Sequence, residues 1–215
     1  MKQFILMADI IDSGKKDSNL LMENFKTLIK EINNSNANDI LSPLTITLGD
    51  ECQGVIKDLS TSIRMILNIE ENIIHNRYNF KLRYVLNEGE IETPINQKIA
   101  YEMLGNGLTE ARFKLNNLKN DKFRFYISIQ NKLQNQILID AFIIYENIVE
   151  KWNLNKDYES VSNFIKYKDY KIISDLMGKT RSLIWKREKS LNIESYNSIK
   201  NIIKNVSLKN DYGNF

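Results

Sequence analysis

Cysteine and histidine are almost absent from this sequence: among 215 residues there is one cysteine, Cys52, and one histidine, His75. A single cysteine excludes an internal disulfide and is typical of a reducing compartment, so a cytoplasmic protein is expected. One histidine and one cysteine give little support to a zinc site or to a Cys–His nucleophile pair. We expect Cys52 to be a buried strand residue and His75 to lie at a helix end.

Proline, glycine and long apolar runs are also scarce. The sequence has 2 Pro and 8 Gly, which disfavours a loop-rich or collagen-like chain, and its 42% hydrophobic content can form a core. No apolar stretch approaches the roughly 18 residues that cross a bilayer, so no membrane partner is expected. The opening MKQFILMADI reaches a charged residue too early for a signal peptide and predicts a strand. P-loop and GxSxG motifs are absent.

Charge is unevenly distributed along the chain. The net charge is +3, but residues 1–150 carry 17 Lys and Arg against 20 Asp and Glu, whereas residues 151–215 carry 13 against 7. A basic C-terminal segment on an acidic body suggests that this segment alone binds a polyanion. The alternative is a solvated lysine-rich surface.

The apolar periodicity predicts an α+β fold. Strands are expected at 2–8, 44–49, 52–56 and 79–87, and amphipathic helices at 18–33 and 59–76. This β-α-β-β-α-β order is that of the antiparallel ferredoxin-like and polymerase-palm sheets. We further expect a strand at 88–95 that pairs back on 79–87 across Gly89, and a short helix at 97–104.

The second half of the sequence is predicted to be mostly helical. A helix follows the Gly-rich turn at 105–107, then a strand at 122–129, a long helix at 131–153, and helices near 157–166, 168–177, 179–190 and 193–206. We therefore expect a palm-like domain over 1–130, a connecting helix over 131–153, a helix-turn-helix module over 154–207 and a frayed tail over 208–215.

Two aspartates stand at the ends of predicted strands: Asp9 in FILMADIIDSG and Asp50 in LTITLGDECQGVI. Carboxylates that converge in this way make a site for Mg²⁺ or Mn²⁺, to which the main-chain carbonyl of Ile10 is a possible further ligand. Glu51 is an alternative ligand. The alternative interpretation is that these are ordinary turn and capping residues.

The loop after the first strand is a candidate phosphate site. Asp12, Ser13 and Gly14 precede the first helix, where phosphate oxygens can meet the helix N-terminus. A metal site of this kind usually holds the phosphates of a nucleotide. Nucleotide binding is therefore predicted here, although the same three residues suit a helix cap.

The segments MADIIDSG, TITLGDECQGVI, LRYVLNEGEIET and GNGLTEARFKL resemble successive motifs of the SatD family of bacterial proteins. The resemblance covers most of the chain, implies an architecture more than an activity, and also implies a winged or simple helix-turn-helix near the end. The same motif order is similar to class III nucleotide cyclases, whose two metal aspartates stand where Asp9 and Asp50 stand here. Cyclases form their sites across dimers, so the resemblance makes a homodimer possible.

The cyclase likeness has departures. The lysine that selects adenine is replaced by Ile46, the transition-state asparagine by Thr109, and the arginine position by Phe113, with Arg112 one residue earlier. A shift of one residue turns a helical side chain by about 100°, so the sequence leaves open whether Arg112 points into the site. We count Thr109 and Arg112 as candidate nucleotide-binding residues and expect binding, or a degenerate enzyme, more than cyclase activity.

Residues 169–192 have a helix-turn-helix pattern. Ile173 and Ile184 occupy its buried positions, Ser174 stands where two helices cross closely, and Gly178 lies in the turn. The second helix and its flanks then offer these residues to DNA: Lys179, Thr180, Arg181, Ser182, Trp185, Lys186 and Arg187. The alternative is a helical hairpin that packs on the sheet or forms a dimer.

The sequence therefore predicts a DNA-binding, regulatory protein whose palm-like domain binds a divalent metal, with a nucleotide as a candidate second ligand. One alternative is a cyclase-like or nucleotidyl-transferring enzyme that uses Asp9 and Asp50 as metal ligands. Another is a degenerate palm that serves only for dimerisation.

Overall fold

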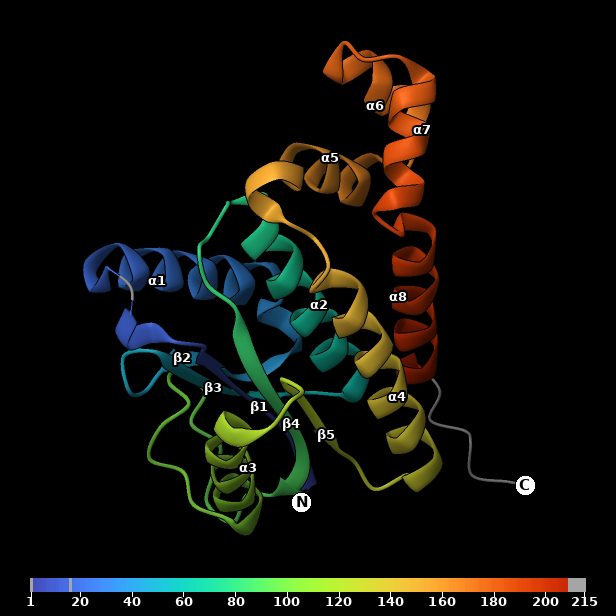
Figure 1. Ribbon diagram of the computed structural model, residues 1–215. Helices are drawn as coiled ribbons and strands as arrows, with labels where there is room; N and C mark the ends of the chain where they lie inside the picture. The colour runs from blue at the N-terminus through green and yellow to red at the C-terminus, as the bar shows by residue number, and fades with distance from the viewer. Residues whose placement is uncertain (1, 16, 209–215) are drawn as a thin grey trace.

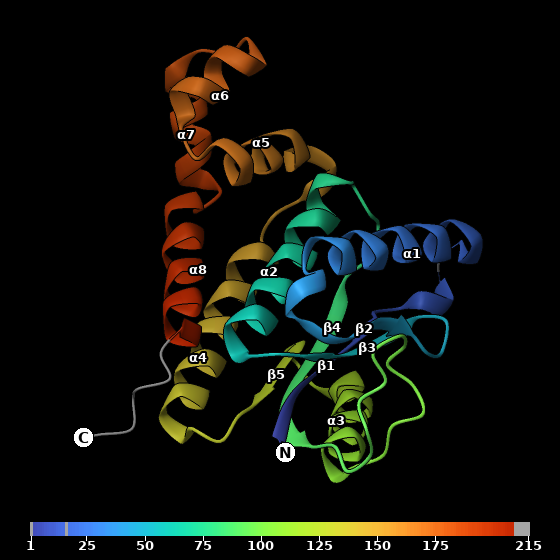
Figure 2. The same ribbon diagram turned by 180° about the vertical axis from the view of Figure 1, so that it is seen from behind.

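The computed structural model describes residues 2–15 and 17–208, which form a sheet with helices on both faces and a helical arm at one end (Figures 1 and 2). The strands are β1 (Lys2–Ile10), β2 (Ile40–Ile46), β3 (Glu51–Ile56), β4 (Leu82–Glu90) and β5 (Phe125–Ser128). The α-helices are α1 (Ser18–Ser35), α2 (Leu59–His75), α3 (Asn106–Asn117), α4 (Lys132–Val149), α5 (Leu154–Tyr167), α6 (Tyr170–Met177), α7 (Arg181–Ser190) and α8 (Ile193–Leu208).

The strand order is β2-β3-β1-β4-β5. The first four strands, with α1 and α2 between them, reproduce the predicted ferredoxin-like order and pair antiparallel. The prediction of a wholly antiparallel sheet was wrong, because β5 pairs parallel to β4. The connection between them runs through α3, as a parallel crossover requires a long link.

Each face of the sheet has its own core. Helices α1, α2 and α4 lie on one face and α3 on the other (Figures 1 and 2). The first face buries residues such as Leu6, Ile56 and Tyr84, and the α3 face buries Ile5 and Val85. Alternate strand residues thus point to opposite faces, which explains the nearly continuous apolar runs in β1 and β4.

Two local predictions between residues 88 and 104 were wrong. Strand β4 continues through Gly89 to Glu90, opposite the start of β1, so residues 88–95 do not form a returning strand. Residues 97–104 form no helix, because their backbone bonds to the sheet instead: Thr45 Oγ1 accepts from the Ala100 N–H at 2.8 Å, and Gln53 donates to the Ala100 carbonyl. This segment covers the β2–β3 part of the sheet.

Helix α3 approaches β4 backbone to backbone. A Cβ on Gly107 would lie 2.6 Å from the Gly89 carbonyl carbon, and one on Gly89 would lie 2.5 Å from Gly107 Cα. Gly105, with φ +158°, starts the helix where a side chain would meet the Glu90 carbonyl oxygen at 2.4 Å. The Gly-rich turn therefore places α3 tightly on the sheet.

The C-terminal helices share the core of the sheet domain. Helix α8 packs on α4 and α2, and the buried Tyr196 donates to Glu71 of α2 at 2.9 Å. One hydrophobic cluster contains both Phe25 of α1 and Ile203 of α8. The domain boundaries at 130 and 153 remain predictions, and the core is continuous across both.

The predicted tail falls mostly outside the described residues. Helix α8 includes Leu208, and residues 209–215 lie beyond what the structure describes.

Cys52 is buried in β3, and burial raises the pKa of its thiol to about 12. Over residues 2–15 and 17–208, no helix has both the length and the apolar character to cross a membrane.

Candidate functional site

Asp9 ends β1 as a buried carboxylate paired with an arginine. Its side chain is 2% exposed, and Arg83 Nη1 of β4 lies 2.9 Å from Asp9 Oδ2. Burial raises the pKa of Asp9; the charge of Lys119 opposes this rise, the charge of Asp50 adds to it, and Arg83 lowers it. The charge of Asp50 therefore acts on Asp9, and the metal site that the two aspartates would form stays a prediction.

Asp50 reaches the same end of the sheet from the β2–β3 turn. Its main-chain carbonyl accepts from the Ile10 N–H at 3.0 Å, and its side chain accepts from the Ser13 hydroxyl. The preceding Gly49 has φ +80°, a conformation that favours glycine. The turn thus fixes Asp50 beside the loop that follows β1.

Three further charged residues complete the cluster on the α3 face. The register pairs Asp9 with Glu51 and with Arg83, so their side chains share one face of the sheet. Glu51 is buried and bound by Arg112 of α3, and Lys119 Nζ lies 3.8 Å from its other oxygen. Arg112 therefore does point into this cluster.

The other predicted nucleotide residues do not gather in one place. Thr109 is exposed, and its hydroxyl bonds only weakly, at 3.4 Å, to the Gly105 carbonyl. Asp12, with φ +57°, lines a cavity of about 810 Å³ bounded by α2, the end of α4 and the start of α5. Gly14 lies in a short 3₁₀ turn, and a Cβ added there would have nothing within 4 Å.

Sequence reasoning missed Arg83, Lys119 and Arg124. Arg83 and Arg124 stand inside apolar segments, which is a signal that the side chain has a buried partner, whereas Lys119 stands in the polar run LNNLKND and gives no such signal. Their partners are Asp9, Glu51 and Glu70, which lie far away in the sequence. The strand register brings Arg83 to Asp9. Lys119, in the 3₁₀ turn Leu118–Asn120, and Arg124, whose partner Glu70 lies in α2, meet their partners through the packing of helical segments against the sheet.

The Asp9–Asp50 pair does not form a ready metal site as arranged. Two carboxylates and the nearby Ile10 carbonyl are of the hard-oxygen type that Mg²⁺ and Mn²⁺ take. However, Asp9 is neutralised by Arg83, and within the described part of the chain no three acidic, histidine or cysteine side chains gather to hold an ion. A metal ion would have to replace the guanidinium of Arg83.

The predicted helix-turn-helix segment folds as two helices joined by a short turn. Gly178 ends α6 in a left-handed conformation, and the Thr180 hydroxyl caps α7 by accepting from the Leu183 N–H. Ile173, Ser174 and Ile184 are buried, at 0%, 2% and 1% exposed. The pair projects from the body as an arm (Figure 1).

The arm presents both cations and apolar side chains to solvent. Exposed residues include Lys179, Arg181, Ser182 and Lys186, while Trp185 is 47% exposed. Arg187 forms an ion pair with Asp157 of α5, so it is held against the body. Five of the seven predicted DNA-contacting residues are thus exposed polar groups, and one of them, Thr180, also serves as the cap.

Comparison with solved structures finds partial likenesses. Two structures of a bacterial light-regulated adenylyl cyclase show 13% identity and TM-scores of 0.41 over 59% of this chain and 43% of theirs. The catalytic core of a rhodopsin-guanylyl cyclase with converted specificity, in complex with ATPalphaS, shows 16% identity and a TM-score of 0.34 over 54% of this chain and 71% of that one. The chain thus spans less than half the length of the light-regulated cyclases, and its fold assignment rests on its own strand order.

No curated protein is significantly similar to this sequence. The family model of the SatD family, in contrast, matches residues 4–213, which is nearly the whole chain. The chain belongs to the SatD family.

Proposed function

We propose that this protein binds DNA through the α6–α7 arm and acts as a regulator. The observation that carries the proposal is the arm itself: a capped helix pair with a buried crossing at Ser174 and exposed cations at the start of its second helix. Lys179 and Arg181 flank the N-terminus of α7, where the helix dipole also favours phosphate. Phosphate contacts of this kind give affinity, and base contacts from α7 give sequence preference.

The test removes three exposed cations from the arm. In the triple variant Lys179→Ala, Arg181→Ala, Lys186→Ala, we expect the affinity for a mixed-sequence duplex to fall at least about tenfold. The slope of log K against log salt should fall by about 3, one for each lost phosphate contact. Fluorescence anisotropy over a salt series measures both quantities. Arg187 is left intact because it is paired with Asp157.

The matched control removes the same charge from the sheet domain. Lys26, Lys30 and Lys57 are exposed lysines outside the arm. Changing all three to Ala should leave the salt slope unchanged if DNA lies on α6–α7. Equal losses in the two triple variants would show non-specific attraction and reject the arm as the DNA site.

A second candidate function uses the palm as a metal-dependent nucleotide site or enzyme. It is favoured by the electrostatic contact of Asp9 with Asp50 and opposed by the Arg83 pair. Here Mg²⁺ or Mn²⁺ would supply charge neutralisation for phosphate oxygens, and Asp9, Asp50 and Ile10 would hold it. A midpoint shift with Mn²⁺ plus a nucleoside triphosphate that disappears in Asp50→Asn would support this function. The absence of any shift would favour a palm that serves only as a scaffold or for dimerisation.

A further inference from the structure

A cavity lies between the sheet domain and the C-terminal helices, and Ile11 and Asp12, immediately after β1, also line it. Its volume is about 810 Å³, and its walls come from the end of α2, residues 77–81, Arg124 and the α4–α5 connection. Cavities of about 300–1,000 Å³ are typical of small-molecule sites. The lining combines aromatic rings with charged groups of both signs.

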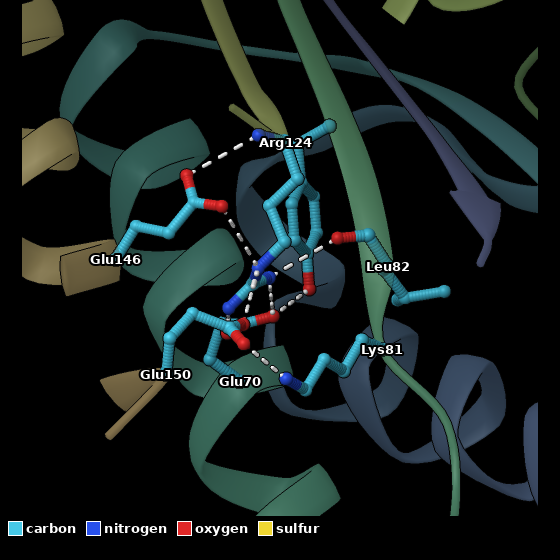
Figure 3. Close-up of polar contacts among 7 residues, drawn as sticks. Glu70, Lys81, Leu82, Arg124, Glu146 and Glu150 are labelled. Atoms are coloured by element: carbon cyan, nitrogen blue, oxygen red, sulfur yellow. Dashed lines mark hydrogen bonds and ion pairs between the residues drawn. The ribbon is translucent and has the colours of Figure 1, made fainter. Parts of the chain in front are cut away.

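Three carboxylates line this cavity, those of Asp12, Glu70 and Glu150, and the two glutamates differ in how firmly they are held. Glu70 is bound through both oxygens by Arg124, at 2.9 and 2.6 Å, and also accepts from the Tyr84 hydroxyl at 2.7 Å. Glu150, in contrast, is 39% exposed; it pairs with Lys81, and its other oxygen lies 3.6 Å from Arg124 Nε (Figure 3). Arg124 Nε is buried and has no hydrogen-bond partner among the described residues, although Glu146 Oε1 also lies 3.9 Å from it. Glu150 therefore lies between two cations and pairs closely with Lys81 but makes no hydrogen bond to Arg124 Nε.

A third cation lines the cavity without an ion pair among the described residues. The guanidinium of Arg77 lies 3.7 Å from the centroid of the Tyr158 ring. A stacked guanidinium keeps its edge N–H groups available for a carboxylate or phosphate. Tyr78 and Trp152 add aromatic surface to the same cavity.

We propose that this cavity binds a small organic anion that carries a carboxylate or phosphate on a flat ring. The anionic group takes the place of the Glu150 carboxylate beside Lys81 and Arg124, and Arg77 provides the third cation. The ring stacks within the aromatic lining. This site is separate from the Asp9–Asp50 pair and from the arm, so it stands or falls independently of the function proposed above.

Fluorescence of Trp152 provides a local readout. The chain has two tryptophans, and Trp185 is exposed on the arm, so Trp185→Phe leaves Trp152 as the only reporter. The probes are AMP for a phosphate on a ring and 4-hydroxybenzoate for a carboxylate on a ring. Adenosine and inorganic phosphate test the ring and the anion alone. We expect a saturable change with AMP or 4-hydroxybenzoate and much weaker binding of both partial probes.

Three variants in the Trp185→Phe background test the roles of the charges. Arg77→Gln and Lys81→Met should each lower the affinity for the probe by about tenfold or more, which is the scale of one charge-assisted contact. Glu150→Gln should strengthen it by a similar factor, because the competing carboxylate is lost. Lys26→Met, which removes an exposed lysine from α1, should bind as the parent does.

Several outcomes would overturn the proposal. If adenosine binds as tightly as AMP, the anionic group does not contribute to recognition. If inorganic phosphate binds as tightly as AMP, the ring does not contribute. Unchanged affinity in both Arg77→Gln and Lys81→Met would place the ligand elsewhere. No saturable change with any probe, even in Glu150→Gln, whose fold is checked by circular dichroism, would mean that the cavity takes no such anion.

Discussion

Arg124 is a charged side chain enclosed by the protein, only 6% exposed and immediately before β5. It binds both oxygens of Glu70, donates to the Leu82 carbonyl at 3.1 Å, and its backbone N–H donates to Glu146 at 3.2 Å (Figure 3). Burial of a charge is compensated only when its partners are in place. Arg124 therefore joins β4 and α2 through its guanidinium and α4 through its backbone N–H.

The change Arg124→Met should be severely destabilising. It leaves Glu70 buried without its cation, so the free energy of unfolding should fall by about 3–5 kcal/mol. Urea denaturation followed by circular dichroism measures the loss. The control is Arg64→Ala, which breaks an exposed pair with Asp39 and should cost at most about 1 kcal/mol. Similar losses of stability in the two variants would contradict the claim that the buried contacts of Arg124 matter more than an exposed ion pair.

The pKa of Asp9 is a second property set at single residues. Because burial raises this pKa above its ordinary value of 3.8, Asp9 keeps its proton to higher pH in the folded state than in the unfolded state. Its contribution to stability is then fully present below pH 3.8 and is lost as the pH rises through the raised pKa. The buried carboxylate thus works against stability at neutral pH.

Two variants should move the pKa of Asp9 in opposite directions. Asp50→Asn removes a nearby negative charge and should lower it, whereas Arg83→Gln removes the paired cation and should raise it. Carboxyl ¹³C chemical shifts recorded over a pH series report both changes. A wild-type Asp9 that titrates below 3.8 would show that ion pairing, and not burial, dominates its environment.

Some positions of single residues could be predicted from the sequence, and others could not. Asp9 and Asp50 were predicted to be neighbours because each ends an apolar strand, and their charges do interact. Arg83 was not foreseen, because its position opposite Asp9 depends on the pairing of two strands 74 residues apart. Thr109 was named by analogy of spacing alone, and it faces solvent.

The close packing of helix α3 on strand β4 depends on glycines. Gly107 and Gly89 bring the helix and β4 into direct backbone contact, which leaves no room for a methyl group. The change Gly107→Ala should therefore destabilise the protein by about 1–3 kcal/mol, although alanine is the better helix former. The control Gly14→Ala, with nothing within 4 Å of the new Cβ, should be nearly neutral.

Thermal and urea unfolding of Gly107→Ala and Gly14→Ala measure the stabilities of the two variants. A Gly107→Ala protein as stable as Gly14→Ala would mean that α3 can move outward from β4 at little cost. Such movement would also shift Arg112, which reaches Glu51 from the same helix. The stability of this helix position and the charge cluster at Asp9 are therefore linked.

The element boundaries show why periodicity alone was insufficient near residue 90. The sequence predicted that the strand at 79–87 turns at Gly89 and that residues 88–95 pair back on it. In the structure Gly89 lies within the strand, because Gly107 requires close approach there. The segment 97–104 failed as a helix for a related reason: its backbone partners are on β2 and β3, which no local pattern specifies.

At the scale of the whole molecule, the C-terminal helices are joined to the sheet domain by buried contacts. Tyr196 is 0% exposed, with its ring 5.7 Å from that of Tyr145 in α4 and 5.0 Å from that of Trp152. Lys200 of the same helix pairs with Glu71 of α2. A cooperative fold follows from such shared burial, since neither part keeps its apolar surface covered alone.

We therefore expect one unfolding transition for the whole chain. Helical circular dichroism and Trp152 fluorescence, read in the Trp185→Phe background, should give the same urea midpoint. The change Tyr196→Ala should lower the free energy of unfolding by about 3–5 kcal/mol and shift both signals together. Trp185→Ala, on the exposed arm, should change it by about 0.5 kcal/mol or less. Separate midpoints, with Tyr196→Ala moving only one of them, would instead divide the chain into two independently folding units.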